Sequence, residues 1–441
     1  MKLCYRTVTK PGYLAAMKKF AYVAIAASLG AWVALASARA APPPQARAVA
    51  EHYADLAEAI YGDSAGSARE LHKAIGTFLQ KPTEPNLSAA RAAWKAARIP
   101  YLQSEGFRFA NSVIDAWEPR VNAWPLDEGL IDYVAPSYGK SSDQNPLYTL
   151  NIIANKKLRV GAKMVDATNI DAALLRQLQE AEGVQTNVST GYHAIEFLLW
   201  GQDLEGPSGG TGERPATDYD VNACSHGNCA RRSAYLKAAS DLLVSDLEEM
   251  AADWKADGKA RAELMAKGDE GALAEILTGL GSLTYGEMAG ERMKLGLMLH
   301  DPEEQQDCFS NNTHNSHFYD EIGIGELWRG HYVRLDGSVV EGANMRDYVT
   351  AADPAAGQRL DAAIDAAQHA ITAIRDMAES KRMAYSQMIA AGNEQGNKLV
   401  QSAMDALIAQ TRAIEGIAAT LHLKVSSNKS DHSGAGAAAL H

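Results

Sequence analysis

The chain has 441 residues, of which 46% are hydrophobic and 22% charged, and its formal charge at pH 7 is −12. An acidic balance of this size argues against a protein that binds nucleic acid or an anionic membrane, and it suits cations or cationic partners. The low aromatic content of 7%, together with abundant alanine, leucine, glutamate and lysine, favours an all-α fold.

The first 40 residues are expected to form a secretory signal peptide outside the fold. From Met17, a short basic start leads into an apolar run over 20–36 and then into small-residue cleavage options near position 40, as in exported proteins. Met17 is therefore the expected start. A transmembrane anchor is the alternative, but this run is at the short end of what spans a bilayer. Removing residues 1–40, which hold six basic and no acidic residues, takes the formal charge from −12 to −18.

Helical spacing of apolar residues predicts the main elements of the rest of the chain. In the first half, helices are expected over 46–61, 67–79, 87–107, 171–180 and 191–200, with a cap at Asn86 or Ser88 and a kink at Pro100. In the second half, they are expected over 233–256, 271–299, 355–390 and 393–423. A glycine-rich linker over 206–214 continues through a cysteine loop to Arg232, which marks a domain boundary. The tail over 425–441 is expected to be disordered.

The cysteine loop "CSHGNC" is interpreted as a local disulfide between Cys224 and Cys229, because an exported protein meets an oxidising compartment. Zinc binding by these cysteines with His226 is the weaker alternative. A c-type haem site is excluded, since it needs histidine after the second cysteine and Ala230 stands there. Cys308 is left unpaired, or paired by a geometry that the sequence does not show.

The stretch "GYHAIEF" holds the first candidate site, because His193 and Glu196 stand three residues apart on one face of a predicted helix. An imidazole and a carboxylate so placed can bind one metal ion, as they do in metal-binding helical bundles. A buried hydrogen-bonded pair without metal is the alternative, which spacing alone favours. Zinc peptidase motifs need a second histidine beside the glutamate, and Phe197 follows instead. A hydrolytic zinc site would have to recruit ligands from elsewhere.

Two other parts of the chain could supply such ligands. The stretch over 301–330 is polar and irregular, and its "NNTHNSH" segment is either a ligand source or a polar loop with exposed histidines. The candidates from both halves are Glu105, Asp127, Glu128, His314, His317, Asp320 and Glu321.

The motif Gly191-x-His193-x-x-Glu196, followed by "FLLWGQD", resembles the signature of the imelysin family. Members of this family are exported bacterial proteins, among them iron-regulated proteins and an insulin-cleaving membrane protease. The blocks "NAWPLDEGLIDYV", "GERPATDY", "CFSNNTH" and "ALIAQTRAIEGIAATL" are also similar to family blocks, so the resemblance covers about residues 45–424. It implies two helical-bundle domains, over 45–205 and 233–424, with 206–232 as linker and a site where the bundles meet. The loop over 310–320 would then approach the motif.

The resemblance implies an exported protein of the periplasm or outer membrane that binds a divalent metal, iron or zinc, or a small iron-bearing ligand in an interdomain cleft. Iron is the preferred metal, and membrane components of iron uptake are the expected partners. His193 and Glu196 would be the primary ligands, with Glu105, Asp127 and His314 as further ones. Two alternatives remain. One is a zinc-dependent metallopeptidase in which Glu196 is catalytic, and the other is a non-catalytic binding module whose His–Glu pair is structural.

Overall fold

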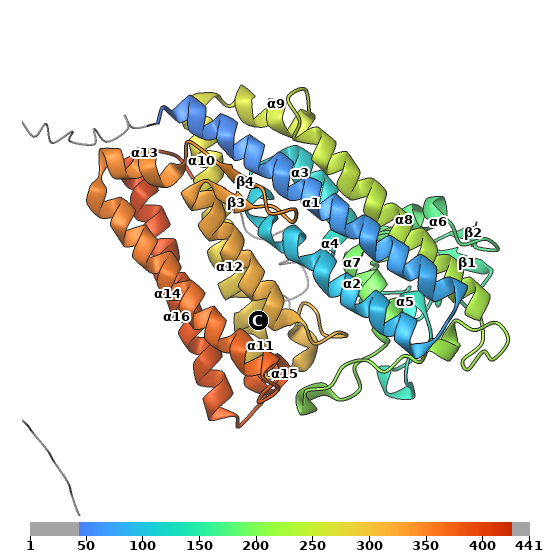
Figure 1. Cartoon of the computed structure of the whole chain (residues 1–441). Helices are drawn as coiled ribbons and strands as arrows, with labels where there is room; N and C mark the ends of the chain where they lie inside the picture. Colours follow the sequence, from blue (N-terminus) through green and yellow to red (C-terminus); the bar gives the residue numbers. More distant parts are fainter. Residues whose placement is uncertain (1–43, 426–441) are drawn as a thin grey trace, which may run out of the picture. The chain divides into compact units, whose positions relative to one another are not determined.

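The computed structural model describes residues 44–425 and is built almost entirely of helices (Figure 1). The predicted all-α fold is therefore confirmed. The predictions of a signal peptide and of a disordered tail over 425–441 concern residues that lie outside the described range, apart from Val425. Within residues 44–425, every helix is too short or too polar to span a lipid bilayer.

Three long helices pack together: α1 (Ala46–Gln80) and α2 (Glu84–Gln103) from the first half of the chain, and α8 (Cys229–Asp253) from the second. Helix α1 packs against both others, and α7 (Gly191–Trp200) packs against α2 and α8. Shorter elements connect these helices: α3 (Ser112–Trp117), α4 (Pro119–Asn122), α5 (Glu128–Ile131), the antiparallel strands β1 (Lys157–Val160) and β2 (Lys163–Asp166), and α6 (Ala172–Leu178). Helix α7, all of whose residues are buried, therefore lies inside this group of helices.

The second half surrounds α12 (Thr313–Arg329), which packs against both α14 (Pro354–Glu379) and α2 of the first half. Helix α14 in turn runs beside α16 (Glu394–Thr420) (Figure 1). The other elements are α9 (Lys259–Ala266), α10 (Gly268–Gly281), a π-helical segment (Ser282–Lys294), α11 (Leu295–Leu299), the antiparallel strands β3 (His331–Val333) and β4 (Val339–Glu341), α13 (Met345–Ala352) and α15 (Tyr385–Ile389).

The close contact between α2 and α12 depends on a glycine. A side chain at Gly323 would place its Cβ 2.5 Å from the carbonyl oxygen of Gln103, which is too close for any carbon. Because α12 can approach the end of α2 in this way, polar residues from the two halves of the chain meet in one buried region. The division into two bundle domains stays a prediction.

Several predicted boundaries are wrong. The break expected between residues 61 and 67 is absent, because α1 runs unbroken through Gly62 and Gly66 while neighbouring residues such as Tyr61 and Ala65 stay buried. Helix α2 begins at Glu84 with a proline in its first turn, so the expected caps at Asn86 and Ser88 lie inside the helix. It also ends at Gln103 rather than at residue 107, and the helix expected over 355–390 ends at Glu379.

The region expected to be irregular, 301–330, is also partly wrong, because most of it forms α12. Its buried face carries polar as well as apolar residues, at helical spacing: His314, His317, Asp320, Glu321, Ile324 and Trp328. Hydrophobic periodicity cannot reveal a helix whose buried face is this polar. The alternative of a loop with exposed histidines is likewise wrong, since His314 is 7% exposed and His317 is 0% exposed.

Candidate metal centre

Helix α7 positions the two residues of the motif. Gly191 begins the helix with a φ of +83°, and a side chain there would place its Cβ 2.4 Å from the Val121 carbonyl oxygen, so only glycine fits. All ten residues of α7 are buried. His193 and Glu196 therefore project from one face of a helix that is enclosed by the protein on every side.

A third side chain joins this pair. His193 Nδ1 lies 2.9 Å from Glu196 Oε2 and 3.8 Å from Asp307 Oδ1. All three side chains have 0% exposure. Within the part of the chain that the structure describes, these residues are the group that offers three metal-ligating atoms within 4.8 Å of one another. We call His193, Glu196 and Asp307 the buried triad. Sequence reasoning missed Asp307, although it directly precedes the "CFSNNTH" block.

The segment over 307–313 contacts the motif, and it overlaps only the start of the 310–320 loop that the resemblance placed there, since α12 begins at Thr313. Ser310 donates to Glu196 Oε1 twice, from its backbone N–H at 2.9 Å and from its hydroxyl at 2.7 Å. The backbone N–H of Asp307 donates to the Thr313 hydroxyl at 3.0 Å, and the Ser316 hydroxyl donates to the Asp307 carboxylate. Each acidic member of the triad is thus held in place by hydroxyl and backbone groups of the second half of the chain.

Burial sets the protonation of the triad. Burial, with the positive charge of Arg98, lowers the pKa of His193 to about 3, so the imidazole is neutral and keeps a lone pair. Burial, with the nearby charge of Asp307, raises the pKa of Glu196 well above its usual value. Arg98 Nη2 lies 3.3 Å from Asp307 Oδ1. Even so, within residues 44–425, His193 Nε2 and Asp307 Oδ1 are buried without a hydrogen bond, which is costly unless another partner satisfies them.

Glu105 lies in a neighbouring network around Arg292, which comes from the π-helical segment. Arg292 donates to Glu105 at 2.6 Å, to Asp320 at 2.8 Å and to Glu287 at 3.2 Å, all of them buried. Burial alone would raise the pKa of Glu105, but Arg292 and Arg108 lower it below its usual value. Glu105 is therefore an ionised partner of arginines and not a member of the triad.

Two side chains, Asn122 and Arg98, connect this network to the triad. Asn122 donates to Glu105 Oε1 at 3.3 Å and accepts a hydrogen bond from Arg98 at 2.5 Å, while Arg98 pairs with Asp307. Hydrogen bonds and ion pairs thus link Glu105 to Asp307 through two intermediate side chains. A substitution in either network should therefore alter the hydrogen bonds and charges of the other.

The structure places the other predicted ligands away from the triad. Asp127 accepts hydrogen bonds from Thr186 at 2.6 Å and from Asn145, and it lines a pocket together with Glu128. His314 Nε2 lies 3.0 Å from Glu379 Oε1. The roles of Glu105, Asp127 and His314 as metal ligands stay predictions.

The cysteine loop contains a disulfide between Cys224 and Cys229. His226 Nδ1 lies 2.6 Å from Asp218 Oδ1, and its ring stacks on Tyr133 with centroids 4.6 Å apart. Because the disulfide consumes both thiolates, the zinc alternative at this loop is not supported. Cys308 is free and buried.

His317 makes stability sensitive to acid. Burial, with the charge of Arg292 and the nearby His314, lowers its pKa from 6.5 to about 3, and neither ring nitrogen has a hydrogen bond within the described residues. The folded protein keeps the ring neutral where the unfolded chain takes up a proton. Its contribution to stability is therefore complete above about pH 6.5 and is lost as the pH falls towards 3.

His317→Gln is expected to reduce the pH dependence of the unfolding free energy between pH 6 and 4 by roughly 1.4 kcal/mol per pH unit. Urea denaturation at several pH values measures this slope. His331→Gln, at an exposed position on β3, is the control and should leave the slope unchanged. Equal slopes in the unmodified protein and in His317→Gln would contradict the assignment.

The fold and the triad define an all-α protein with a buried His–Glu–Asp cluster suited to a metal ion. The family model described as Imelysin matches residues 57–414, and the chain belongs to the imelysin family.

Three relatives illustrate what the chain is similar to. It is 37% identical over 67 residues to "Iron-regulated protein A" of Synechococcus elongatus, a match that covers 15% of this chain and spans about a fifth (19%) of that relative. A solved structure of a candidate iron-regulated protein A precursor from Parabacteroides distasonis has a TM-score of 0.59 at 16% identity, covering 87% of this chain and 97% of that one. An imelysin-like protein from Psychrobacter arcticum has a TM-score of 0.57 at 15% identity, covering 87% and 98%. At such identities, these two structures establish the fold alone.

Proposed function

We propose that this protein binds a divalent metal ion, with iron as the physiological ion, through His193, Glu196 and Asp307. The observation that carries the proposal is the presence of three potential ligand atoms within 4.8 Å of one another at a fully buried position. One neutral imidazole and two carboxylates suit ferrous iron, and they also suit manganese or zinc. A bound cation would offset the close approach of the two buried carboxylates and would add a second positive partner to Asp307 Oδ1, which lies 3.3 Å from Arg98 Nη2.

Iron is chosen among these metals on the strength of the relatives, one of which is named iron-regulated protein A. Export rests on the pattern of a basic start and an apolar run before residue 40. Together they support a role in iron acquisition in the periplasm or at the outer membrane, with iron-uptake components of the membrane as partners. The position of the triad, between α7 and the 307–316 segment of the second half, supports a site between the two halves.

The geometry of the triad supports metal binding better than it supports peptidase activity. A catalytic zinc keeps one coordination position open for water and substrate. The three side chains of the triad have 0% exposure, and no second histidine stands beside Glu196. A peptidase would need a large opening of the 307–313 segment before any peptide bond could reach Glu196.

The experiment is a metal titration of the tag-free mature protein after chelation, carried out with Fe²⁺ under anaerobic conditions and in parallel with Mn²⁺ and Zn²⁺. We expect one ion per chain, taken up slowly because the triad is closed from solvent. Retention of no ion above the level of a buffer blank, after prolonged incubation with each metal, would overturn the proposal.

A further inference from the structure

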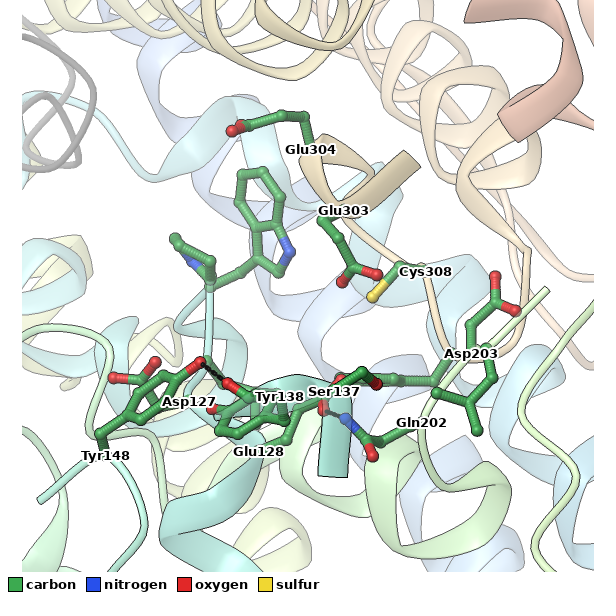
Figure 2. A pocket seen from close by; sticks show the side chains of 15 residues that line it. Asp127, Glu128, Ser137, Tyr138, Tyr148, Gln202, Asp203, Glu303, Glu304 and Cys308 are labelled. Carbon is green, nitrogen blue, oxygen red and sulfur yellow. Dashed lines mark hydrogen bonds between the residues drawn. The ribbon is translucent and has the colours of Figure 1, made fainter. Parts of the chain in front are cut away.

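A second candidate site lies on the other side of the segment that closes the triad. Along this segment, Asp307 belongs to the triad and Ser310 contacts it, whereas Cys308 and Phe309 line a pocket of about 490 Å³. Figure 2 shows Glu303 and Cys308 facing Tyr138 and Glu128 across this pocket. The volume is typical of sites for small molecules rather than for single ions.

The pocket is strongly acidic. Five carboxylates line it, from Asp127, Glu128, Asp203, Glu303 and Glu304. Among the described residues that line it, none is a lysine or an arginine. Nothing on its walls therefore balances these negative charges, and a cation would do so.

The neighbouring acids in the pocket raise one another's pKa values. Glu128 is 6% exposed, and burial raises its pKa to about 8, with Glu303, Asp127 and Asp203 acting in the same direction. The Glu303 side chain is partly in solvent, but desolvation by the protein around it raises its pKa to about 7. The negative charges of Asp301 and Asp203 raise this pKa further. Such mutual repulsion is relieved when a positive ligand enters.

The spread of these acids does not suit a bare metal ion. Within residues 44–425, the three-ligand grouping inside 4.8 Å is the buried triad, and the pocket carboxylates form no such grouping. A metal ion in the pocket would have to keep most of its water ligands, because no three of these acids offer oxygens within 4.8 Å of one another in the described residues. The arrangement instead suits a ligand that carries several positive charges at some distance from one another.

The remaining walls supply apolar and polarisable surface. The rings of Tyr138 and Tyr148 stack with centroids 4.3 Å apart and planes at 8°, and Trp124 and Phe309 also line the pocket. Aromatic faces attract alkylammonium groups and pack against methylene chains. Cys308 is 7% exposed and is not part of a disulfide. In Figure 2 it is directed into the pocket and is available to a ligand.

We propose that this pocket binds an aliphatic polyamine, a chain of methylenes with two or more ammonium groups. The ammonium groups would pair with Glu128, Asp203 and the rim carboxylates, while the methylenes would pack against the tyrosines and Phe309. This site is separate from the triad and does not depend on the proposed metal function.

The test is calorimetric titration of the metal-free protein with spermidine at pH 8, where Glu128 is substantially ionised. We expect 1:1 binding that weakens at least tenfold in Glu128→Gln and in Asp203→Asn. Glu70→Gln removes the same charge at an exposed position on α1 and should bind as the unmodified protein does.

Two companion probes complete the test. Mg²⁺ at equal concentration should compete poorly with spermidine, and a lysine-containing peptide should bind more weakly than spermidine. The proposal is overturned if spermidine does not bind, if both pocket variants bind as tightly as Glu70→Gln, or if Mg²⁺ displaces spermidine at matched concentration. Tighter binding of the peptide would assign the pocket to basic side chains of proteins and would also overturn it.

Discussion

His193→Ala is expected to weaken metal binding by roughly 100-fold or more, since changes even to the outer shell of a metal site cost 10- to 100-fold. The substitution removes the sole nitrogen of the triad and leaves the carboxylates of Glu196 and Asp307 facing each other at 0% exposure. Metal content by elemental analysis and affinity by calorimetry, both on the tag-free protein, measure the effect.

Two further variants make this result specific. Glu196→Gln keeps the shape of the side chain and its hydrogen bonds from Ser310 but removes a negative ligand, so it should also lose most of the affinity. His331→Ala, at an exposed position, should bind metal normally. If His193→Ala and Glu196→Gln keep full affinity and only lower the melting temperature, the pair is a structural clamp, and the metal assignment fails.

Arg292→Met is expected to lower the unfolding free energy by about 3 to 5 kcal/mol, the usual cost of breaking a buried ion pair from one side. Arg292 lies between the carboxylates of Glu105, Asp320 and Glu287, all within 3.2 Å. Without it, Glu105 loses the charge that contributes most to lowering its pKa. Urea denaturation monitored by far-UV circular dichroism measures the loss.

The matched control is Arg329→Met, which makes the same side-chain change at another arginine. Arg329 pairs with Asp365 at 2.7 Å, but both side chains are exposed, at 38% and 74%. A surface pair of this kind contributes about 0 to 1 kcal/mol. Equal destabilisation by the two variants would contradict the view that the Arg292 network is a buried and interdependent unit.

Helix α7 could be predicted from the sequence at both ends. Its limits at Gly191 and Trp200 follow from local chemistry, because Gly191 and Gly201 both adopt positive φ, at +83° and +73°, where glycine is favoured. The apolar run between them is long enough to identify a buried helix. The motif residues His193 and Glu196 therefore share one face, as their spacing indicated.

Asp307 could not be predicted in the same way. Its contact with His193 joins residues from opposite halves of the chain, and local spacing carries no information about such pairing. The segment that brings it there is held by hydrogen bonds from Ser310 and Ser316, which look like ordinary turn residues in the sequence. Helix α12 could not be predicted for a related reason. Its buried positions include the polar residues His317 and Asp320, so its apolar periodicity is weak.

We propose that His193, Glu196 and Asp307 together hold one metal ion. Anomalous X-ray diffraction at the iron absorption edge, from crystals of the protein loaded with Fe²⁺, tests it most directly. We expect one strong peak within bonding distance of the His193 imidazole and of the two carboxylates. A loaded crystal with no peak at the triad, or with a peak only in the acidic pocket beside Glu128, would contradict it.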